Sequence, residues 1–352
     1  HSSTCSSIRQ TIQPPPSRDF MARDKMGRPL RDLRVSVTDR CNFRCGYCMP
    51  REKFGRHHKF LPNNRILSYE QIQRFIAACI PLGLNKVRIT GGEPLLRRDL
   101  FELVSMVSSL GLEVALTTNG SLLADQSDKL YRAGLNRVTV SLDALDPDLH
   151  SKITDSVIPV GEVIRGIESA VSSGLNPVKV NCVVRRGLNE SEVAPLVRHF
   201  RGTGVIVRFI EFMDVGSTNR WSFGQVVPTS EVLQTLSSEF DLFPMERKSP
   251  TDVASRWAHS DGSGEIGFIS SVTEPFCGGC VRARLSSDGK LFTCLFSNKG
   301  YDLADRLTFS EPIQVLTAEI SKIWSARSDR YSELRSPKPN SLPRVEMSYI
   351  GG

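Results

Sequence analysis

Six of the nine cysteines in this 352-residue chain fall into two tight groups, and they are the residues best suited to chemistry. The first group is Cys41, Cys45 and Cys48, spaced C-x3-C-x2-C, and the second is Cys277, Cys280 and Cys294, spaced C-x2-C-x13-C. Clustered cysteines in so long a chain indicate metal ligands rather than a framework of disulfides. Because a structural zinc ion or an electron-transfer cluster takes four protein ligands, three thiolates leave one metal position open for another molecule.

The second cysteine group leaves two alternatives open. A more distant His or Cys, with His259 the nearest histidine, would complete a structural zinc site. Alternatively, the three thiolates hold an iron–sulfur cluster whose open iron faces a substrate.

Basic residues recur in the segments expected to be strands. In the run 85–90, apolar residues alternate with Lys86 and Arg88, and the side chains of a strand alternate between its two faces. The same alternation directs Arg34, Lys179 and Arg208 to the inner faces of their own strands. Unpaired buried cations are costly, so an anion such as a polyphosphate would compensate them. Pairing with carboxylates such as Glu93 or Glu211 is the alternative.

These residues need a scaffold in which strands and helices alternate. We expect strands at 32–37, 85–90, 113–118, 137–142, 177–184 and 205–212, and helices at 68–80, 99–110, 123–133, 160–173 and 190–200. Strict alternation implies parallel strands, in an open sheet or a barrel. The unusual residues cluster at the downstream ends of the strands, in 38–50, 90–94, 117–120 and 141–143, where barrels carry their active face. The sequence therefore predicts an α/β fold, a partial (βα)6 TIM-like barrel.

We expect three parts along the chain. Residues 1–26 form a flexible N-terminal segment, and residues 1–18 contain serines, threonines and arginines but no acid, as in a trimmed transit peptide or a ragged terminus. Residues 27–220 form the barrel core. The alternation stops near residue 214, and residues 221–352 form a C-terminal domain with the second cysteine group, a helix near 311–325 and a diglycine end.

Charge and hydropathy argue against two classes of partner. The formal net charge is +7, but no block of Lys and Arg is interleaved with aromatic residues, so we expect no nucleic-acid partner. No apolar run approaches the length of a membrane-spanning helix, so we expect no membrane association. A basic pocket for an anionic small molecule explains the net charge equally well.

The first cysteine group resembles the signature loop of the radical S-adenosylmethionine (SAM) superfamily, in which an aromatic residue, here Tyr47, precedes the last cysteine. The run Gly91-Gly92-Glu93-Pro94 resembles the GGEP motif of the same superfamily, which binds the amino group of SAM. Its glycines allow close backbone approach, and its glutamate is an acceptor for an ammonium. The resemblance implies a radical SAM barrel with a four-iron four-sulfur cluster whose open iron is chelated by SAM.

From Gly27 to Gly352 the chain resembles the molybdenum cofactor biosynthesis protein A family, the GTP 3′,8-cyclases. The matching segments are both cysteine groups, 32–36, 86–97, 117–120, 140–143, 178–183, 208–213, the run Cys280-Val281-Arg282-Ala283-Arg284 and the terminal Gly351-Gly352. Two stretches depart from the family pattern. Ile153-Thr154-Asp155-Ser156 lacks an arginine often found there, and the segment from Gly55 to Asn64 is unusually basic.

The resemblance implies a role for each candidate residue. Cys41, Cys45 and Cys48 would hold the SAM cluster, with Tyr47, Gly92, Glu93, Ser141 and Met213 around SAM. Cys277, Cys280 and Cys294 would hold a second four-iron four-sulfur cluster, whose open iron meets the guanine. Arg34, Lys86, Arg88, Thr118, Lys179, Arg208, Arg282 and Arg284 would bind GTP. Gly351 and Gly352 would insert into the barrel, where the terminal carboxylate orients an arginine such as Arg34 for catalysis.

The implied activity is that of a lyase that converts GTP to (8S)-3′,8-cyclo-7,8-dihydroguanosine 5′-triphosphate, which opens molybdenum cofactor (molybdopterin) biosynthesis. Implied partners are a flavodoxin- or ferredoxin-like reductant, the downstream cyclic pyranopterin monophosphate synthase, and a second copy of the chain in a homodimer. The expected location is an intracellular reducing compartment, either the cytoplasm or the mitochondrial matrix. The rival functions are a peptide-modifying radical SAM enzyme with an auxiliary cluster and a zinc-dependent binding module.

Overall fold

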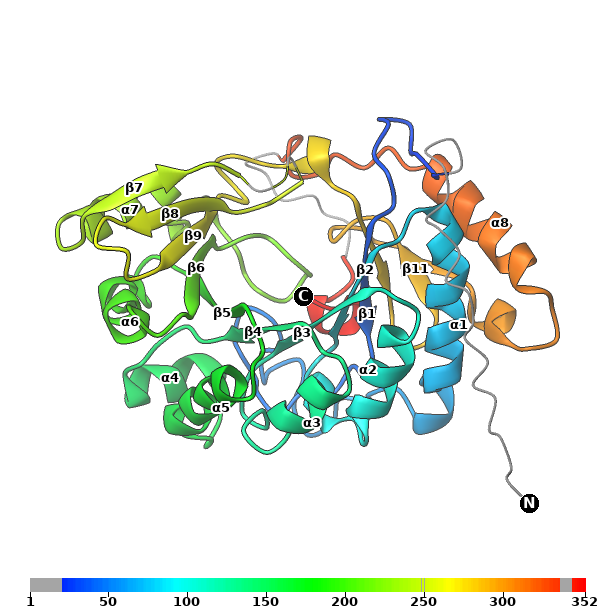
Figure 1. The fold of residues 1–352 in the computed structure, drawn as a ribbon, viewed down its shortest axis with the longest axis horizontal. Helices are drawn as coiled ribbons and strands as arrows, with labels where there is room; N and C mark the ends of the chain where they lie inside the picture. The colour runs from blue at the N-terminus through cyan, green and yellow to red at the C-terminus, as the bar shows by residue number, and fades with distance from the viewer. Residues whose placement is uncertain (1–20, 248, 250, 336–343) are drawn as a thin grey trace, which may run out of the picture.

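A curved sheet forms the centre of the molecule (Figure 1). The computed structural model describes residues 21–247, 249, 251–335 and 344–352, so the flexibility expected for residues 1–20 lies outside the described residues. The sheet has twelve strands in the order β12-β11-β10-β1-β2-β3-β4-β5-β6-β9-β8-β7. Its middle strands are β1 (Asp32–Ser36), β2 (Lys86–Thr90), β3 (Glu113–Thr118), β4 (Arg137–Ser141), β5 (Val178–Val184) and β6 (Ile206–Glu211). Each pairs in parallel with the next, which confirms the partial (βα)6 barrel predicted from the sequence.

The helices between these strands lie along the outer face of the sheet (Figure 1). They are α1 (Tyr69–Cys79), α2 (Leu100–Ser108), α3 (Ser127–Arg132), α4 (Pro147–Thr154), α5 (Val160–Ser172) and α6 (Val193–Phe200). Short 3-10 helices lie at Asn63–Arg65, Ile80–Leu82, Pro94–Leu96, Glu190–Glu192, Phe223–Gln225, Cys277–Gly279 and Ala304–Leu307. The sequence did not predict α4, which begins where the Asp146 side chain accepts a hydrogen bond from Leu149 N at 2.8 Å. Its eight residues are too few for a clear helical period.

The C-terminal part of the chain extends the same sheet at both edges. Its elements are α7 (Thr229–Ser237), β7 (Leu242–Met245), β8 (Ser255–His259), β9 (Glu265–Ile269), β10 (Arg282–Leu285), β11 (Lys290–Phe292), β12 (Tyr301–Asp302), α8 (Ile313–Ser325) and α9 (Met347–Ile350). β9 pairs in parallel with β6, and β10 pairs in parallel with β1. The strict alternation stops after β6, as expected, because α7 is followed by the antiparallel β7 and β8 before β9 pairs in parallel with β6. The helix α8 matches the one expected near 311–325, whereas the domain division near 220 stays a prediction.

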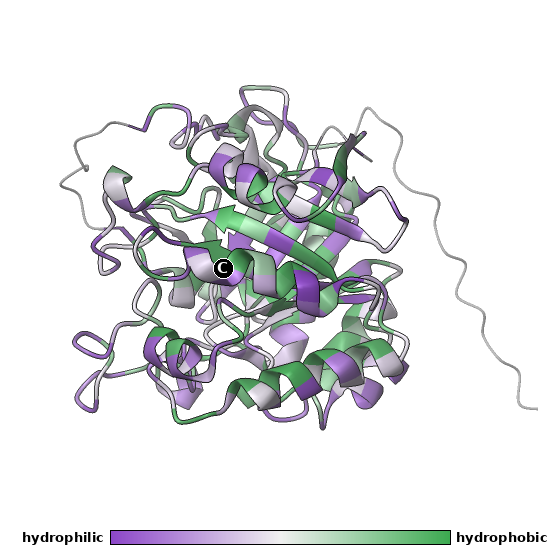
Figure 2. Ribbon diagram, turned by 90° about the vertical axis from the view of Figure 1, so that its left-hand side faces the viewer, coloured by the Kyte–Doolittle hydropathy of each residue, from purple (hydrophilic) through white to green (hydrophobic). Residues whose placement is uncertain are grey.

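Alternating burial along the strands separates an apolar outer face from a polar inner one. Every second residue of β5 is buried, and hydrophobic and hydrophilic bands alternate along the strands in Figure 2. The partly exposed positions of β2 and β5 include Lys86, Arg88 and Lys179. The outer face packs against the helices, so the cations are left on the inner face. No helix in the described part of the chain is long and apolar enough to cross a membrane.

Candidate active site

The first cysteine group lies in the loop that follows β1. Its turn is closed by Cys48 N, which donates to Cys45 O at 3.0 Å. Two donors approach the sulfur of Cys41, Phe43 N at 3.4 Å and Asn119 Nδ2 at 3.8 Å. All three cysteines are free, and burial raises the pKa of the Cys41 thiol to about 11. The loop therefore offers three unpaired, largely sheltered sulfur atoms at the downstream end of β1.

The glycine-rich turn after β2 braces this loop. Gly92 N donates to Thr38 O at 2.8 Å, and Glu93 N donates to Arg40 O at 2.7 Å. A Cβ atom on Gly92 would lie 2.2 Å from the carbonyl oxygen of Arg40. Only glycine therefore allows the turn to approach the backbone that leads into the cysteine loop.

The carboxylate of Glu93 is fully buried within this turn. It accepts hydrogen bonds from Thr118 Oγ1 at 2.7 Å, from Asn119 N at 2.7 Å and from Leu95 N at 3.0 Å. Burial raises the pKa of Glu93 to about 7. Glu93 holds Thr118 and the turn together, and its role as an acceptor for the SAM ammonium stays a prediction.

The other residues expected around SAM lie at the same edge of the sheet. Ser141 is the last residue of β4, and Met213 lies two residues beyond β6. The hydroxyl of Tyr47 donates to Asp143 Oδ2 at 2.7 Å. Met213 O accepts from Asn219 Nδ2 at 3.0 Å. These residues and the cysteine loop thus share the downstream end of the barrel, as the sequence predicted.

The second cysteine group lies at the opposite end of the same strands. Cys280 comes two residues before β10, whose first residue, Arg282, pairs in register with Asp32 at the start of β1. Cys294 follows β11, which runs antiparallel to β10 and so returns to that end. Because Cys41 follows the far end of β1, the inner face of the barrel separates the two groups.

Two buried arginines that the sequence did not predict hold the second cysteine loop. Arg28 Nη1 donates to Cys277 O at 2.8 Å, and Arg327 Nη1 donates to Cys280 O at 2.8 Å. Both guanidinium groups pair with Asp24 Oδ2, at 2.6 and 3.3 Å. We call these three residues the arginine clamp. Its members come from distant parts of the chain, so no local spacing could reveal them.

The geometry does not support the zinc alternative. His259 lies on β8, where its ring packs against Phe240 with the centroids 5.6 Å apart, far from β10 in the strand order. Although burial acts in the opposite direction, the charges of Arg282 and Arg327 lower the pKa of Cys280 to about 6. Cys280 therefore has a cationic environment that favours a thiolate, whereas burial raises the pKa of Cys294 to about 11.

A row of like charges crosses three strands between the two cysteine groups. Arg34 on β1 pairs in register with Arg284 on β10 and with Arg88 on β2, and we call these residues the arginine row. Burial and the neighbouring Arg284 hold the pKa of Arg34 well below its usual range. Its Nε is buried without a hydrogen-bond partner among the described residues. This arrangement is electrostatically unfavourable unless an anion joins it.

The other inward cations have only weak or neutral partners. Arg88 Nη1 donates to the Thr117 and Thr139 hydroxyls at 3.1 and 3.2 Å. Lys86 Nζ lies 3.8 Å from Asp32 and 4.0 Å from Glu113. The cations thus retain most of their capacity to bind an anion.

On the far side of the barrel, Arg208 Nε donates to Asn181 Oδ1 at 2.9 Å. Burial and the nearby Arg208 lower the pKa of Lys179 to about 7. The carboxylate of Glu211 accepts from Thr229 N at 3.0 Å and from Thr273 Oγ1 at 2.6 Å. Neither Glu211 nor the buried Glu93 forms an ion pair with an inward cation that the structure describes, so the pairing alternative fails for both.

The C-terminal tail enters the open side of the barrel (Figure 1). Arg284 Nη1 donates to Gly351 O, and Gly351 is buried with a φ of 78°, in the left-handed region that favours glycine. A Cβ atom on Gly351 would lie 2.2 Å from Thr90 Cγ2. Gly351 is thus hydrogen-bonded to Arg284, the neighbour of Arg34 in the arginine row.

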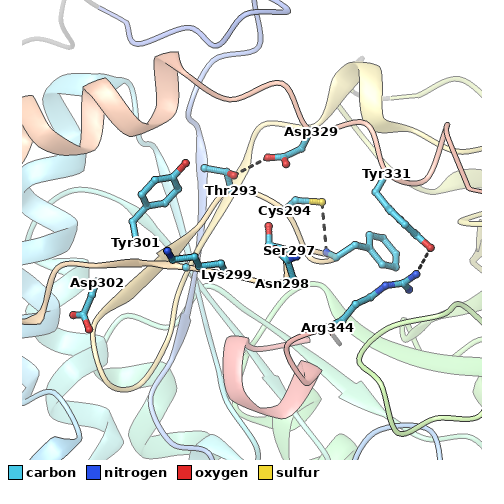
Figure 3. Close-up of a pocket in the computed structure, with 12 residues that line it drawn as sticks. Thr293, Cys294, Ser297, Asn298, Lys299, Tyr301, Asp302, Asp329, Tyr331 and Arg344 are labelled. Carbon is cyan, nitrogen blue, oxygen red and sulfur yellow. Dashed lines mark hydrogen bonds between the residues drawn. The ribbon is translucent and has the colours of Figure 1, made fainter. Parts of the chain in front are cut away.

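A cavity of about 810 Å³ lies beside Cys294 (Figure 3). Thr293 donates to Asp329 at 2.6 Å on one wall, and Arg344 donates to the Tyr331 hydroxyl on another. None of the cations predicted to bind substrate lines this cavity. It borders the second cysteine group through Cys294.

Comparison with known proteins agrees with this layout. The family model of the Radical SAM superfamily matches residues 35–200, and that of Molybdenum Cofactor Synthesis C matches residues 205–333. The GTP 3′,8-cyclase of Acidothermus cellulolyticus is 48% identical over 94% of this chain and 99% of its own length. Those of Xanthomonas axonopodis pv. citri and Staphylococcus epidermidis are 48% and 44% identical, each over 94% of this chain and 98% of its own length.

Solved structures with low sequence identity share the fold. Streptococcus suis SuiB bound to S-adenosylmethionine aligns with a TM-score of 0.60 at 14% identity, over 88% of this chain and 72% of SuiB. SuiB bound to its precursor peptide SuiA aligns with a TM-score of 0.59 at 13% identity, over 85% of this chain and 66% of SuiB. At this identity the likeness shows the fold alone, and the peptide belongs to SuiB.

Proposed function

We propose a role in the reaction for each candidate residue of this chain, which belongs to the GTP 3′,8-cyclase family within the radical SAM superfamily. It is a radical SAM lyase that converts GTP to (8S)-3′,8-cyclo-7,8-dihydroguanosine 5′-triphosphate, the first step of molybdenum cofactor biosynthesis. It uses SAM and a four-iron four-sulfur cluster, which together supply the 5′-deoxyadenosyl radical that takes hydrogen from the ribose C3′. The task left to the protein is to bind, orient and shield the reactants.

The cluster that serves SAM is held by Cys41, Cys45 and Cys48 in this proposal. Three free thiols and two N–H donors near one sulfur support the assignment. The SAM molecule would lie along the same edge of the sheet, against the residues Tyr47, Gly92, Glu93, Ser141 and Met213. The close packing of the turn at Gly92 against Arg40 keeps this edge compact.

Cys277, Cys280 and Cys294 hold a second four-iron four-sulfur cluster in this proposal, with its open iron toward the guanine. The arginine clamp and the cationic surroundings of Cys280 support an anionic group there. The test is the iron and acid-labile sulfide content of anaerobically prepared protein, for which we expect about eight irons per chain. Replacing the three cysteines by Ala together should remove about half the iron and keep SAM binding. Loss of all the iron, or of none, would contradict two independent clusters.

GTP binds between the two cysteine groups, with its triphosphate on the inward cations. The observation that carries this assignment is the arginine row, in which Arg34 lies between two other arginines and its buried Nε has no hydrogen-bond partner in the described part of the chain. A triphosphate accepts several charge-assisted hydrogen bonds and removes the repulsion. The other proposed GTP contacts are Lys86, Thr118, Lys179, Arg208 and Arg282.

Anaerobic incubation with GTP, SAM and dithionite tests the activity, and formation of the cyclised nucleotide is expected. For binding, Arg282→Ala combined with Arg284→Ala should weaken GTP affinity by calorimetry at least about tenfold, since each charged hydrogen bond contributes about 1.5–3 kcal/mol. Arg198→Ala on α6, whose exposed guanidinium pairs with Glu239, is the matched control and should leave GTP affinity unchanged. Unchanged affinity in the double variant would remove these arginines from the substrate site.

The remaining assignments concern partners and location. We propose a flavodoxin- or ferredoxin-like reductant, cyclic pyranopterin monophosphate synthase as the next enzyme, and a homodimer. An intracellular reducing compartment, either the cytoplasm or the mitochondrial matrix, suits a chain whose described cysteines are all free. Size-exclusion chromatography with light scattering tests the dimer.

A further inference from the structure

A basic surface follows the first cysteine loop, and the reaction described above makes no use of it. The segment 51–65, here called the basic segment, holds five Lys or Arg residues against one acid. Arg51 and Arg65 face Asp155 and Asp288, but Lys53, Arg56 and Lys59 are exposed and form no ion pair with any residue that the structure describes. The basic segment therefore presents free positive charge to the solvent.

An aromatic stack fixes the shape of the basic segment. The ring of His58 lies between those of Phe54 and Phe60, with centroid separations of 4.7 and 4.6 Å. The guanidinium groups of Arg40 and Arg44 lie 5.9 and 5.7 Å from the centroid of Phe60. Phe54 is buried, so the stack is anchored in the protein and the cations project from a defined surface.

The same stack is joined to the first cysteine group through one side chain. Arg44 Nε donates to Phe54 O at 2.8 Å, and Arg44 Nη1 donates to Cys41 O at 2.7 Å. A single guanidinium therefore bridges the basic segment and the backbone of a proposed cluster ligand. Because electron transfer slows steeply with distance, an electron donor for this cluster has to dock close to this loop.

We propose that the basic segment is the docking surface for an acidic one-electron carrier protein that reduces the first cluster. The idea rests on the proposed function, since a redox cluster at Cys41 is what requires the carrier. In each encounter the reduced carrier loses one electron and the oxidised cluster gains it. Free surface cations attract an acidic partner and raise the rate of productive encounter, and salt weakens this effect.

The test uses reduced flavodoxin of net negative charge as the probe and stopped-flow absorbance of the cluster as the readout. Arg56→Glu with Lys59→Glu should slow reduction at least about tenfold at low ionic strength, with the difference narrowing in high salt. Lys25→Glu with Lys322→Glu makes the same charge change beside α8 and should have little effect. With dithionite as the reductant, the rates of cluster reduction, SAM cleavage and GTP cyclisation in both variants should match those of the unmodified protein.

Three results would overturn the proposal. The first is an unchanged flavodoxin rate in the Arg56→Glu and Lys59→Glu variant, and the second is equal slowing in the control, which would assign the effect to net charge. The third is binding of RNA or of anionic vesicles that this variant alone loses, with reduction by flavodoxin unaffected. Absence of dithionite-driven cyclisation in the unmodified protein would instead refute the proposed function, so the two failures are distinguishable.

Discussion

The inner face of the barrel lowers the pKa of individual lysines, of which Lys179 is the clearest example. Burial and Arg208 lower its pKa to about 7, and burial lowers that of Lys86 to about 8. A lysine with a lowered pKa is charged only on the acid side of that value, whereas a bound polyphosphate favours the charged form. Both lysines should therefore take up protons when the anion binds.

We expect GTP affinity to fall as the pH rises from 7.5 to 9, because binding must then recharge lysines that are largely neutral in the free protein. The Kd should rise by up to about tenfold per pH unit for each proton taken up. Calorimetry at each pH measures the Kd for GTP. Lys179→Arg keeps a permanent charge and should flatten the profile. If the Kd of the Lys179→Arg variant changes with pH as steeply as that of the unmodified protein, Lys179 does not take up a proton when GTP binds.

The arginine clamp gives a second prediction for individual residues. Arg327→Gln removes the donor to Cys280 O and one of the two cations on Asp24, so the second cysteine loop should lose its support. We expect loss of iron from the second cluster, by iron analysis and electron paramagnetic resonance, while the first cluster stays. Arg132→Gln removes an exposed ion pair with Asp128 on α3, away from the second cysteine loop, and serves as the control. Equal retention of both clusters in the two variants would reduce the clamp to a packing role.

At the scale of elements, the catalytic loops depend on close backbone contact between neighbouring strands. The turn after β2 and the loop after β1 are joined by hydrogen bonds from Gly92 N and Glu93 N. The side chain of Glu93 extends this network to Thr118 at the end of β3. The downstream ends of three adjacent strands are therefore tied into one unit.

Gly92→Ala should disturb this unit, since its Cβ would lie 2.2 Å from Arg40 O. We expect a loss of about 1–3 kcal/mol in the free energy of unfolding and weaker SAM binding, from urea unfolding and calorimetry. Gly46→Ala within the cysteine loop is the matched control, because a Cβ there meets nothing within 4 Å. Equal behaviour of the two variants would mean that the backbone relaxes around the added methyl.

The sequence predicted the six central strands to within about one residue at each end, because each is rich in β-branched residues and is followed by a turn and a segment with helical periodicity. It could not predict that β10 pairs with β1 and β9 pairs with β6 at the two edges of the six central strands, since the sequence of a short strand does not indicate its partner. Arg28 was missed for a related reason: its contact with Cys277 spans 249 positions of the chain. The contact between Gly351 and Arg284 likewise depends on where a distant strand lies.

At the scale of the whole molecule, the two cysteine groups lie at opposite ends of β1 and β10, and the arginine row lies between them. The tail enters this space from the open side of the barrel and contacts Arg284 (Figure 1). A substrate bound to the arginine row would therefore lie between the two cysteine groups and could be contacted from both.

Deleting Gly351 and Gly352 should leave iron content, SAM cleavage and GTP binding near normal while the cyclised product is lost, since the tail orients the arginines rather than supplying affinity. Gly351→Ala should act like the deletion, because of its φ of 78° and the contact of its Cβ with Thr90. Gly352→Ala should be milder, since its Cβ meets only the flexible Met347 side chain at 3.2 Å. Chromatography of the nucleotides measures product, and full yield from the truncated chain would leave the tail without a catalytic role.

The pairing of β1 with β10 also bears on how the chain is made. A ribosome that has released β1 must add about 250 residues before β10 appears, which takes roughly 10–50 s at ordinary elongation rates. Throughout that interval one edge of the nascent sheet is unpaired, and the edge of β6 is open until β9 follows. Exposed edges invite aggregation. Chaperones that shelter nascent chains should therefore raise the yield of correctly folded protein.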